Sequence, residues 1–302
     1  MTALPPALTG AVYDRGYRPY QGPRGGRREA TLALWRLSVR RALGLRRSWR
    51  QKVFPWSLLA IATIPAIVNV GVAWAIQDNP FEMREFSFIT YREYVGVSTV
   101  LLLFVALTAP DIVCPDRAQR VLPLLFSRPL SGVDYVVAKV AAIAFIVFGF
   151  SFLPQVVLFV GQMLVSDGAL DYLTDNAAVL WQVPVSVALL AIYYGAVSVA
   201  VASLTDRRIV GGVSILGLAL VTSAVAGILY EATGGEGTPL TLLNVMFLPL
   251  EVRDLVFLGH LSEDESGLSG VAGGGAMAVG AYLGVLAVAI AVLLRRYREV
   301  DL

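Results

Sequence analysis

Apolar residues along the chain gather in long blocks separated by shorter polar segments. Six blocks reach the length of about 20 residues that an α-helix needs to cross a bilayer. They lie near residues 54–77, 95–114, 136–165, 179–204, 209–230 and 271–294. The third block is longer than a bilayer requires, so we expect its helix to tilt or to project from the membrane. The pattern predicts an all-α integral membrane protein with six transmembrane helices.

A further apolar segment, residues 239–260, lies between the fifth and sixth blocks. It contains Glu251, Arg253 and Asp254, and Pro249 interrupts it. A seventh span here would also move the basic C-terminal residues to the opposite side of the membrane. We therefore expect short outer helices that lie on or dip into the outer leaflet, between spans five and six.

The N-terminal region, residues 1–53, has two parts. Residues 13–28 are rich in Gly, Pro, Tyr and Arg and should be extended, whereas residues 29–52 show helical spacing. The apolar positions of this helix are Leu32, Trp35, Val39, Ala42 and Leu43, and its basic positions include Arg36, Arg40, Arg47 and Arg50. A basic amphipathic helix with a Trp predicts an interfacial helix on the cytoplasmic leaflet, in contact with membrane lipids. The alternative is a solvated helix that only carries positive charge.

Composition and charge agree with a membrane protein and give it an orientation. Of the residues, 57% are hydrophobic and 15% are charged, against about 25% charged in soluble domains. Segments 1–53, 115–139, 205–208 and 295–302 hold 21 of the 24 Lys and Arg residues, and the other connections hold 14 of the 22 acids. Basic residues mark the cytoplasmic side. We expect both termini in the cytoplasm, a leader over 1–53 and a transmembrane domain over 54–302.

The chain has few residues for enzyme chemistry. One cysteine, Cys114, and one histidine, His260, exclude a disulfide framework and a metal site built from several His or Cys side chains. The two lysines, Lys52 and Lys139, do not follow glycine, so there is no G-x-x-x-x-G-K-[S/T] phosphate-binding loop. We expect no catalytic residue, no metal and no cofactor on this chain, and no nucleic acid as a partner.

The predicted spans are almost free of ionisable residues. Proton- or ion-coupled transporters usually carry such groups deep in the membrane, so their scarcity weakens that class. The neutral polar residues that best fit a translocation pathway are Asn69, Gln155, Gln162, Tyr193 and Tyr194. The alternative is that these side chains form hydrogen bonds between helices.

The connector between spans two and three, "DRAQRVLPLLFSRPLSGVDYVVAK" (116–139), is too polar to span and too apolar to be a solvated loop. Residues 117–126 predict a short helix with Asp116 as its N-cap. Pro123 falls inside this range, so the helix is kinked or starts later. Its apolar ridge comprises Leu122, Leu125 and Phe126, flanked by Arg117, Arg120 and Arg128. Apolar anchors with an arginine rim suit a protein docking site. The alternative is a loop that packs on its own membrane domain or on lipid headgroups.

The connector also resembles a known family. "LLFSRPLSGVDYVVAKVAAIAF" (124–145) is similar to the cytoplasmic segment of ABC-2 type permeases, the membrane subunits of ATP-binding cassette exporters. The matching residues are Leu124, Leu125, Ser127, Arg128, Pro129, Leu130, Ser131, Tyr135 and Lys139. The leader "YDRGYRPYQGPRGGR" resembles that of a bacterial subgroup of these permeases.

The resemblance implies a coupling region, residues 115–132, that docks on a separate ATPase subunit carrying ATP and Mg²⁺. The coupling residues that it implies are Asp116, Arg117, Arg120, Leu124, Leu125, Phe126, Ser127, Arg128 and Pro129. It further implies a second permease subunit, identical or different, that faces this one through spans one and five and the outer helices. The location would be a bacterial cytoplasmic membrane.

The expected function is export of an amphipathic or lipid-like substrate by alternating access, because the spans carry so little charge. Three alternatives stay open from the residues alone. They are an ATP-independent secondary transporter or channel, a lipid- or peptide-modifying intramembrane enzyme, and a regulatory membrane protein without transport.

Overall fold

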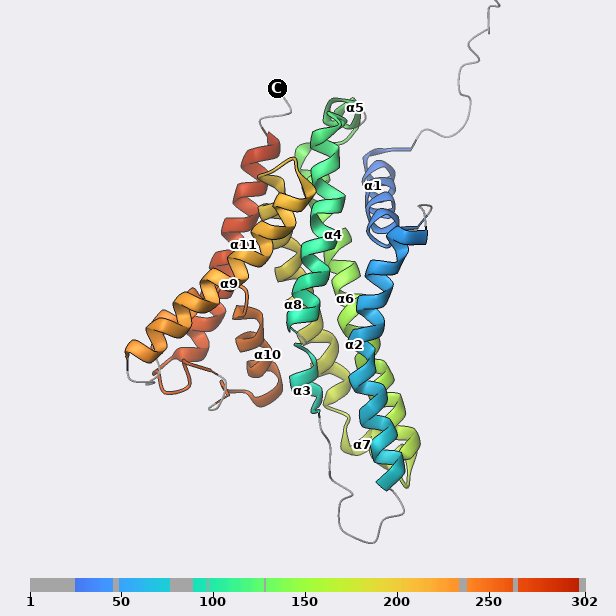
Figure 1. The fold of residues 1–302 in the computed structure, drawn as a ribbon, viewed down its shortest axis with the longest axis vertical. Helices are drawn as coiled ribbons and strands as arrows, with labels where there is room; N and C mark the ends of the chain where they lie inside the picture. Colours follow the sequence, from blue (N-terminus) through green and yellow to red (C-terminus); the bar gives the residue numbers. More distant parts are fainter. Residues whose placement is uncertain are drawn as a thin grey trace, which may run out of the picture.

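A computed structural model of the chain describes residues 25–45, 49–76, 89–96, 98–127, 129–233, 238–262 and 266–298. Within these ranges every regular element is a helix. Six helices are long and apolar enough to cross a membrane, and they run side by side in an elongated bundle (Figure 1). The prediction of an all-α protein with six candidate spans is confirmed.

The six long helices match the predicted blocks, with shifted ends. They are α2 (Trp49–Ile76), α4 (Ser98–Ala118), α6 (Gly132–Val165), α8 (Val179–Ser203), α9 (Arg208–Ala232) and α11 (Gly274–Arg298). α4 continues beyond residue 114 and α6 begins before residue 136, so the connector between them is shorter than expected. Ser131 and Asp134 form a reciprocal capping box that starts α6.

Six shorter helices complete the described chain. They are α1 (Arg27–Ala42), α3 (Tyr91–Tyr94), α5 (Leu122–Phe126), α7 (Ala169–Asp175), the 3₁₀-helix η2 (Pro239–Leu243) and α10 (Leu248–Leu258). α10 has 11 residues, about 16 Å at 1.5 Å per residue, which is too short to cross a bilayer. The short helices predicted within 239–260 are therefore present, and this segment is not a seventh span.

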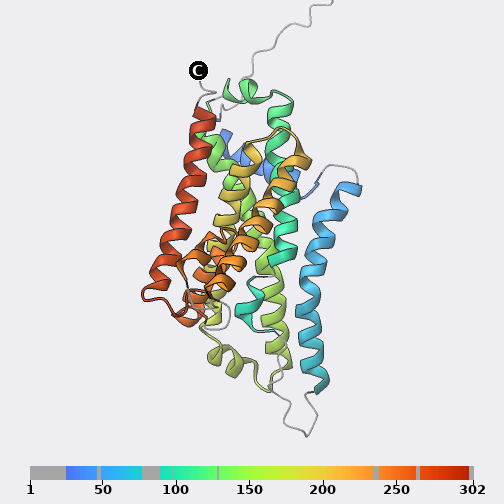
Figure 2. The same cartoon turned by 60° about the vertical axis from the view of Figure 1, so that its left-hand side comes forward.

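The short elements gather at two ends of the bundle (Figures 1 and 2). The connector end holds α1, α5, the turn 204–207 between α8 and α9, and the C-terminal turn of α11. The distal end holds α3, α7 and α10. Two views show α1 running across the bundle rather than along it. The first and the last described helices, α1 and α11, thus both reach the connector end (Figures 1 and 2).

α8 forms the centre of the bundle. In its most apolar window 72% of the residues are buried, against 17% in α2 and 22% in both α9 and α11. A Cβ atom on Gly195 of α8 would lie 3.1 Å from the backbone nitrogen of Ala144, so glycine permits the close approach of α8 to α6. α2, α9 and α11 instead leave long apolar faces exposed.

α1 is shorter than the predicted helix 29–52. It ends at Ala42, and Gly44 adopts a φ of 65° while Leu45 donates a backbone hydrogen bond to Arg40. This left-handed glycine terminates the helix, so the prediction of one continuous helix to residue 52 is wrong. Trp49 already belongs to α2.

The packed face of α1 keeps most of the predicted apolar positions, because Ala42 is buried and Trp35, Val39 and Leu43 pack against the core. Leu34, Ser38 and Ala42 are buried, whereas Leu32 is 49% exposed. These buried positions recur every four residues and face α6 and α4. Ser38 fits this interior because its hydroxyl donates to the Leu34 carbonyl at 2.9 Å.

Candidate functional site

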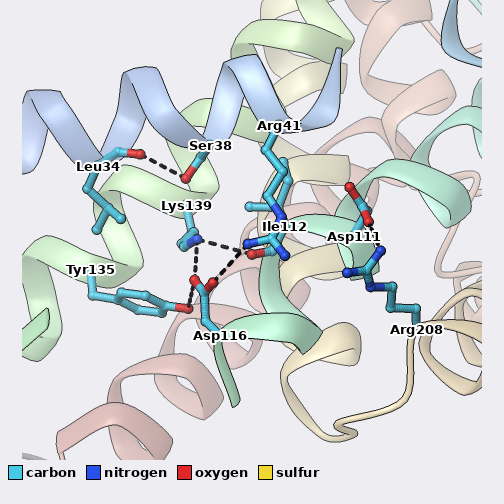
Figure 3. Close-up of polar contacts among 9 residues, drawn as sticks. All are labelled: Leu34, Ser38, Arg41, Asp111, Ile112, Asp116, Tyr135, Lys139 and Arg208. Atoms are coloured by element: carbon cyan, nitrogen blue, oxygen red, sulfur yellow. Dashed lines mark hydrogen bonds and ion pairs between the residues drawn. The ribbon is translucent and has the colours of Figure 1, made fainter. Parts of the chain in front are cut away.

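The connector end contains a buried group of charges that joins α1, α4 and α6 (Figure 3). Asp116 lies in the last turn of α4, and Lys139 of α6 places its Nζ 2.5 Å from Oδ2 of this carboxylate. Arg41 of α1 places a guanidinium nitrogen 3.2 Å from Oδ1. The Tyr135 hydroxyl donates to Oδ2 at 3.1 Å. We call Arg41, Asp116, Tyr135 and Lys139 the Asp116 cluster.

The Asp116 cluster carries one net positive charge, because one carboxylate faces two cations. The side chain of Lys139 is 3% exposed, whereas that of Arg41 is 20% exposed. Ions removed from water stay stable only where geometry is good and further hydrogen bonds complete their shell. The Ile112 carbonyl provides such a bond by accepting from Lys139 at 3.1 Å. Asp116 is thus the group that stabilises the buried ammonium.

The turn between α4 and α5 corrects the predicted capping. Asp116 lies inside α4, and α5 begins at Leu122 with Val121 in the preceding position. The prediction of Asp116 as the N-cap is therefore wrong, whereas the later start within 117–126 that Pro123 suggested is confirmed. Two cations hold this carboxylate more strongly than backbone N–H groups would. Arg120 makes the turn with a φ of 52°, a left-handed conformation that is uncommon outside glycine.

The apolar residues of α5 face two ways. Leu122 is buried, and Leu125 and Phe126 are half-buried against the main core. Leu124 faces away from the bundle and is 70% exposed. The ring centroid of Phe126 lies 6.2 Å from that of Tyr135, so α5 packs directly on the Asp116 cluster.

The predicted arginine rim has members with different surroundings. Arg117 pairs with Asp206 at 3.1 Å and also donates to the Ser203 carbonyl, so it ties α4 to the turn 204–207. Arg120 is exposed near Leu124 in the chain. Two further coupling residues, Ser127 and Pro129, are exposed as well, and Arg128 lies outside the described residues.

The interfacial residues on α1 divide in the same manner. The Trp35 ring packs edge-on against Phe145 of α6, with 5.3 Å between the ring centroids. Arg36 and Arg40 are exposed on the other side of the helix, and Arg47 lies outside the described residues. α1 therefore presents basic side chains outward and is fixed to α6 by its aromatic residue.

The five candidate pathway residues do not converge on one channel. Gln162 donates to Asn69 at 2.7 Å, which links α6 to α2, and Gln155 donates to the Tyr91 carbonyl at 3.2 Å. Tyr193 and Tyr194 donate to the carbonyls of Val245 and Met246 at 2.5 and 2.7 Å. The structure therefore places these side chains in contacts between elements, in line with the alternative interpretation.

The largest cavity described, about 450 Å³, lies between α1, α2, α4 and α9. Apolar side chains such as Phe54, Leu107 and Leu216 line its walls. Its rim is charged and includes Arg41 of the Asp116 cluster together with Asp111 and Arg208, which are 2.5 Å apart. An apolar interior with a charged rim suits an amphipathic molecule.

Four residues of this site, Arg41, Tyr135, Lys139 and Arg296, were not among the predicted coupling residues. Arg41 is one of many basic residues in the leader, and Tyr135 gave no sign of its bond to Asp116. Arg296 of α11 donates to the Ser203 carbonyl at 2.8 Å, so three helices meet at this carbonyl. The sequence held no clear signal for Arg41, because the packed position of Ser38 one turn before it is seen only in the structure.

Comparison with known proteins finds no family model and no curated protein that matches the chain. The class of protein therefore comes from the structure alone: it is a helical membrane protein with six candidate spans.

Proposed function

We propose that the chain is the permease subunit of an ABC exporter, with a separate ATPase subunit docked on residues 115–132. The observation that carries this proposal is the geometry of α5. Leu124 is 70% exposed, whereas Leu125 and Phe126 pack inward. A force on Leu124 would reach α1, α4 and α6 together, because these helices meet at the Asp116 cluster directly below.

In this proposal ATP and Mg²⁺ bind the partner ATPase, and this chain converts closure of that partner into movement of its spans. The cargo is amphipathic or lipid-like and moves outward by alternating access. The cavity of about 450 Å³ between α2, α4 and α9 supports this cargo class through its apolar walls and ion-paired rim.

The proposal includes a second permease subunit in the membrane. α2 and α9 bury only 17% and 22% of their most apolar windows, so their faces are available to a second permease or to lipid. The connector end would face the cytoplasm of a bacterial cell, with the basic side of α1 on the inner leaflet. The distal end would lie outside.

Leu124→Asp tests the docking surface. A charge at this exposed position should leave folding intact. It should prevent the ATPase from co-purifying and abolish the stimulation of its ATP hydrolysis, because apolar anchors dominate such interfaces. Leu204→Asp is the matched control, since Leu204 is 60% exposed at the same end of the bundle. The proposal fails if wild type binds no ATPase, if Leu124→Asp keeps full ATPase stimulation, or if a proton gradient alone drives transport.

Cysteine labelling tests the orientation. Cys114 is fully buried, so a membrane-impermeant maleimide should not label the wild-type protein. Leu124→Cys should react in inside-out vesicles, and Leu240→Cys, at a position 44% exposed in η2, should react in right-side-out vesicles. The reverse pattern would contradict a cytoplasmic connector end.

A further inference from the structure

The cavity between α1, α2, α4 and α9 has a rim whose charges do not balance. Among the described residues three charged ones line it, Arg41, Asp111 and Arg208, so the rim carries one net positive charge. In Figure 3 the pair of Asp111 and Arg208 lies on the opposite side of Arg41 from Lys139. Asp116, the partner of Arg41, does not line the cavity. The side chains of Arg208 and Arg41 are 46% and 20% exposed, so a molecule at the mouth of the cavity can reach them.

Arg208 has hydrogen-bond donors that its ion pair does not use. A guanidinium has five N–H donors in a planar fork, and Arg208 uses Nη1 to donate to Asp111 at 2.5 Å. No described residue accepts from its Nε or Nη2. Guanidinium groups bind carboxylates and phosphates through such neighbouring N–H groups. Asp111 thus occupies one edge of this guanidinium and leaves another edge open to a second anion.

The position of Arg208 at the start of α9 also favours an anion. The positive end of a helix dipole lies at the N-terminus, where negative groups are stabilised and cations are not. The first turn of α9 contains no acidic residue, and its N-cap, Arg207, makes no capping hydrogen bond with its side chain. Asp206, just before it, pairs with Arg117 of α4 at 3.1 Å. Two adjacent arginines therefore add to the positive potential of this helix end.

The apolar walls of the cavity lead from this charged mouth to the side of the bundle. Phe54 of α2, Leu107 of α4 and Val213 of α9 line the cavity and are 64%, 49% and 63% exposed. Exposed apolar surface of this kind contacts lipid in a membrane. The cavity of about 450 Å³ is about three times as large as one of about 150 Å³, which holds one benzene molecule. It therefore has room for part of a hydrocarbon chain.

We propose that this cavity binds an acidic amphiphile from the leaflet at the connector end. Its carboxylate or phosphate accepts hydrogen bonds from Arg208, Arg41 adds positive charge, and its hydrocarbon chain passes between α2 and α9 into lipid. A fatty acid and a phospholipid with an anionic head share this chemistry. Amphiphiles without negative charge lose the contact with Arg208 and bind more weakly. The role of this molecule as cargo rests on the proposed exporter function, whereas its binding needs no ATPase.

Photolabelling of the full chain in phosphatidylcholine nanodiscs, without an ATPase, tests the site. One pair of probes is a hexadecanoic acid that carries a diazirine in mid-chain and the uncharged primary amide of the same compound. The other pair is a phosphatidic acid and a diacylglycerol with that same acyl chain. At about pH 9 both acids are ionised and arginine stays protonated.

We expect the acids to label residues 54–58 and 209–216 about tenfold more than their uncharged partners, the effect of one hydrogen bond to a charged group. A preference within one pair alone would support the site and identify the head as a carboxylate or a phosphate. Equal labelling within both pairs would overturn the proposal.

Variants of Arg208 test the contact with the acidic head. Arg208→Gln should abolish the preference for the acids. The double variant Asp111→Asn, Arg208→Gln should do the same, and it leaves no carboxylate without its cation. A preference retained in either variant would overturn the role of Arg208. Arg207→Gln is the matched control, because Arg207 is the neighbouring residue, is exposed and does not line the cavity. An equal loss in Arg207→Gln would show an effect of general surface charge and overturn the site.

Two Trp variants test the position of the hydrocarbon chain. Val213→Trp places a large ring at the wall and should reduce labelling by all four probes. Val210→Trp is its control, because Val210 is 45% exposed on the same helix and does not line the cavity. Equal labelling of these two variants would contradict binding in the cavity. Labelling by the acids without ATP-driven transport of them in proteoliposomes would reject the exporter function and keep the binding site.

Discussion

The two ends of the bundle each contain a buried carboxylate with two cations, but these groups join different parts of the molecule. At the connector end Asp116 meets Arg41 and Lys139, from α1 and α6. At the distal end Asp254 lies 2.7 Å from Arg253, its neighbour in the chain, and 3.3 Å from Arg92 of α3. We call Arg92, Arg253 and Asp254 the Asp254 cluster.

The difference lies in what each cluster holds together. The Asp116 cluster joins two long helices and α1, from positions far apart in the chain. The Asp254 cluster joins the short helices α3 and α10, and the side chain of Arg92 is 18% exposed. Two tyrosines of α8 also hold the segment before α10 through the carbonyls of Val245 and Met246. Similar charges thus join α1 and two long helices at one end and attach short helices at the other.

Asp116→Asn should have the largest effect. Removal of the carboxylate leaves the buried Lys139 without its counter-charge, which costs about 3 kcal/mol or more. Thermal unfolding of the purified protein in detergent would measure the loss. The double variant Asp116→Asn, Lys139→Met should recover part of it, because no buried ammonium remains. An unchanged unfolding midpoint in the single variant would contradict the role of the Asp116 cluster.

Asp254→Asn should cost less, about 2 kcal/mol. The cluster is carried by the short helices α3 and α10, which can shift to hydrate the site more easily than the long helices α4 and α6. The same unfolding experiment compares the two aspartates directly. ATPase stimulation should persist in Asp254→Asn and be lost in Asp116→Asn. Equal losses of stability and stimulation would show that the two clusters are not distinct.

Tyr194→Phe should have a smaller effect, about 0.6 kcal/mol, the average for hydrogen bonds between membrane helices. It removes the bond to the Met246 carbonyl while keeping the ring in the core. Protease digestion of the segment 238–262 should become faster, since α8 holds this segment less firmly. Tyr230→Phe, at a position 39% exposed on α9, is the control, and equal digestion of both variants would contradict the attachment.

Arg27→Gln should have the smallest effect. Arg27 is 2.6 Å from Asp134 at the connector end, and this carboxylate raises the pKa of the guanidinium by accepting its hydrogen bond. The Arg27 side chain is 63% exposed, and exposed ion pairs contribute little. We expect no measurable change in the unfolding midpoint. A loss of stability as large as that of Asp116→Asn would show that burial does not determine the order of effects among these variants.

The sequence predicted the long helices well because membrane spans are specified by local composition. Blocks of about 20 apolar residues need no knowledge of tertiary contacts. The end of α1 was also encoded locally, in Gly44, but the basic residues on both sides of it suggested continuity. α10 was recognised as short because Pro249 and three charged residues interrupt its apolar pattern.

The candidate site was harder to predict because its charges come from distant segments. Asp116 preceded a predicted helix and fitted an N-cap, yet Arg41 and Lys139 approach it only in the folded bundle. The direction of α5 was hidden for a similar reason. The sequence placed Leu122, Leu125 and Phe126 on one ridge, but only packing against the core decides that this ridge faces inward and Leu124 outward.

The pairing of Asp116 with Lys139 also has a consequence for biogenesis. Synthesis from the N-terminus delivers α4 to the bilayer before α6, so the carboxylate arrives before its ammonium. Each charge alone opposes the entry of its helix into lipid. The carboxylate and the ammonium neutralise each other only when both helices are present. The two helices are therefore expected to become committed to the membrane together, as a hairpin, and the short connector between them favours that pairwise insertion.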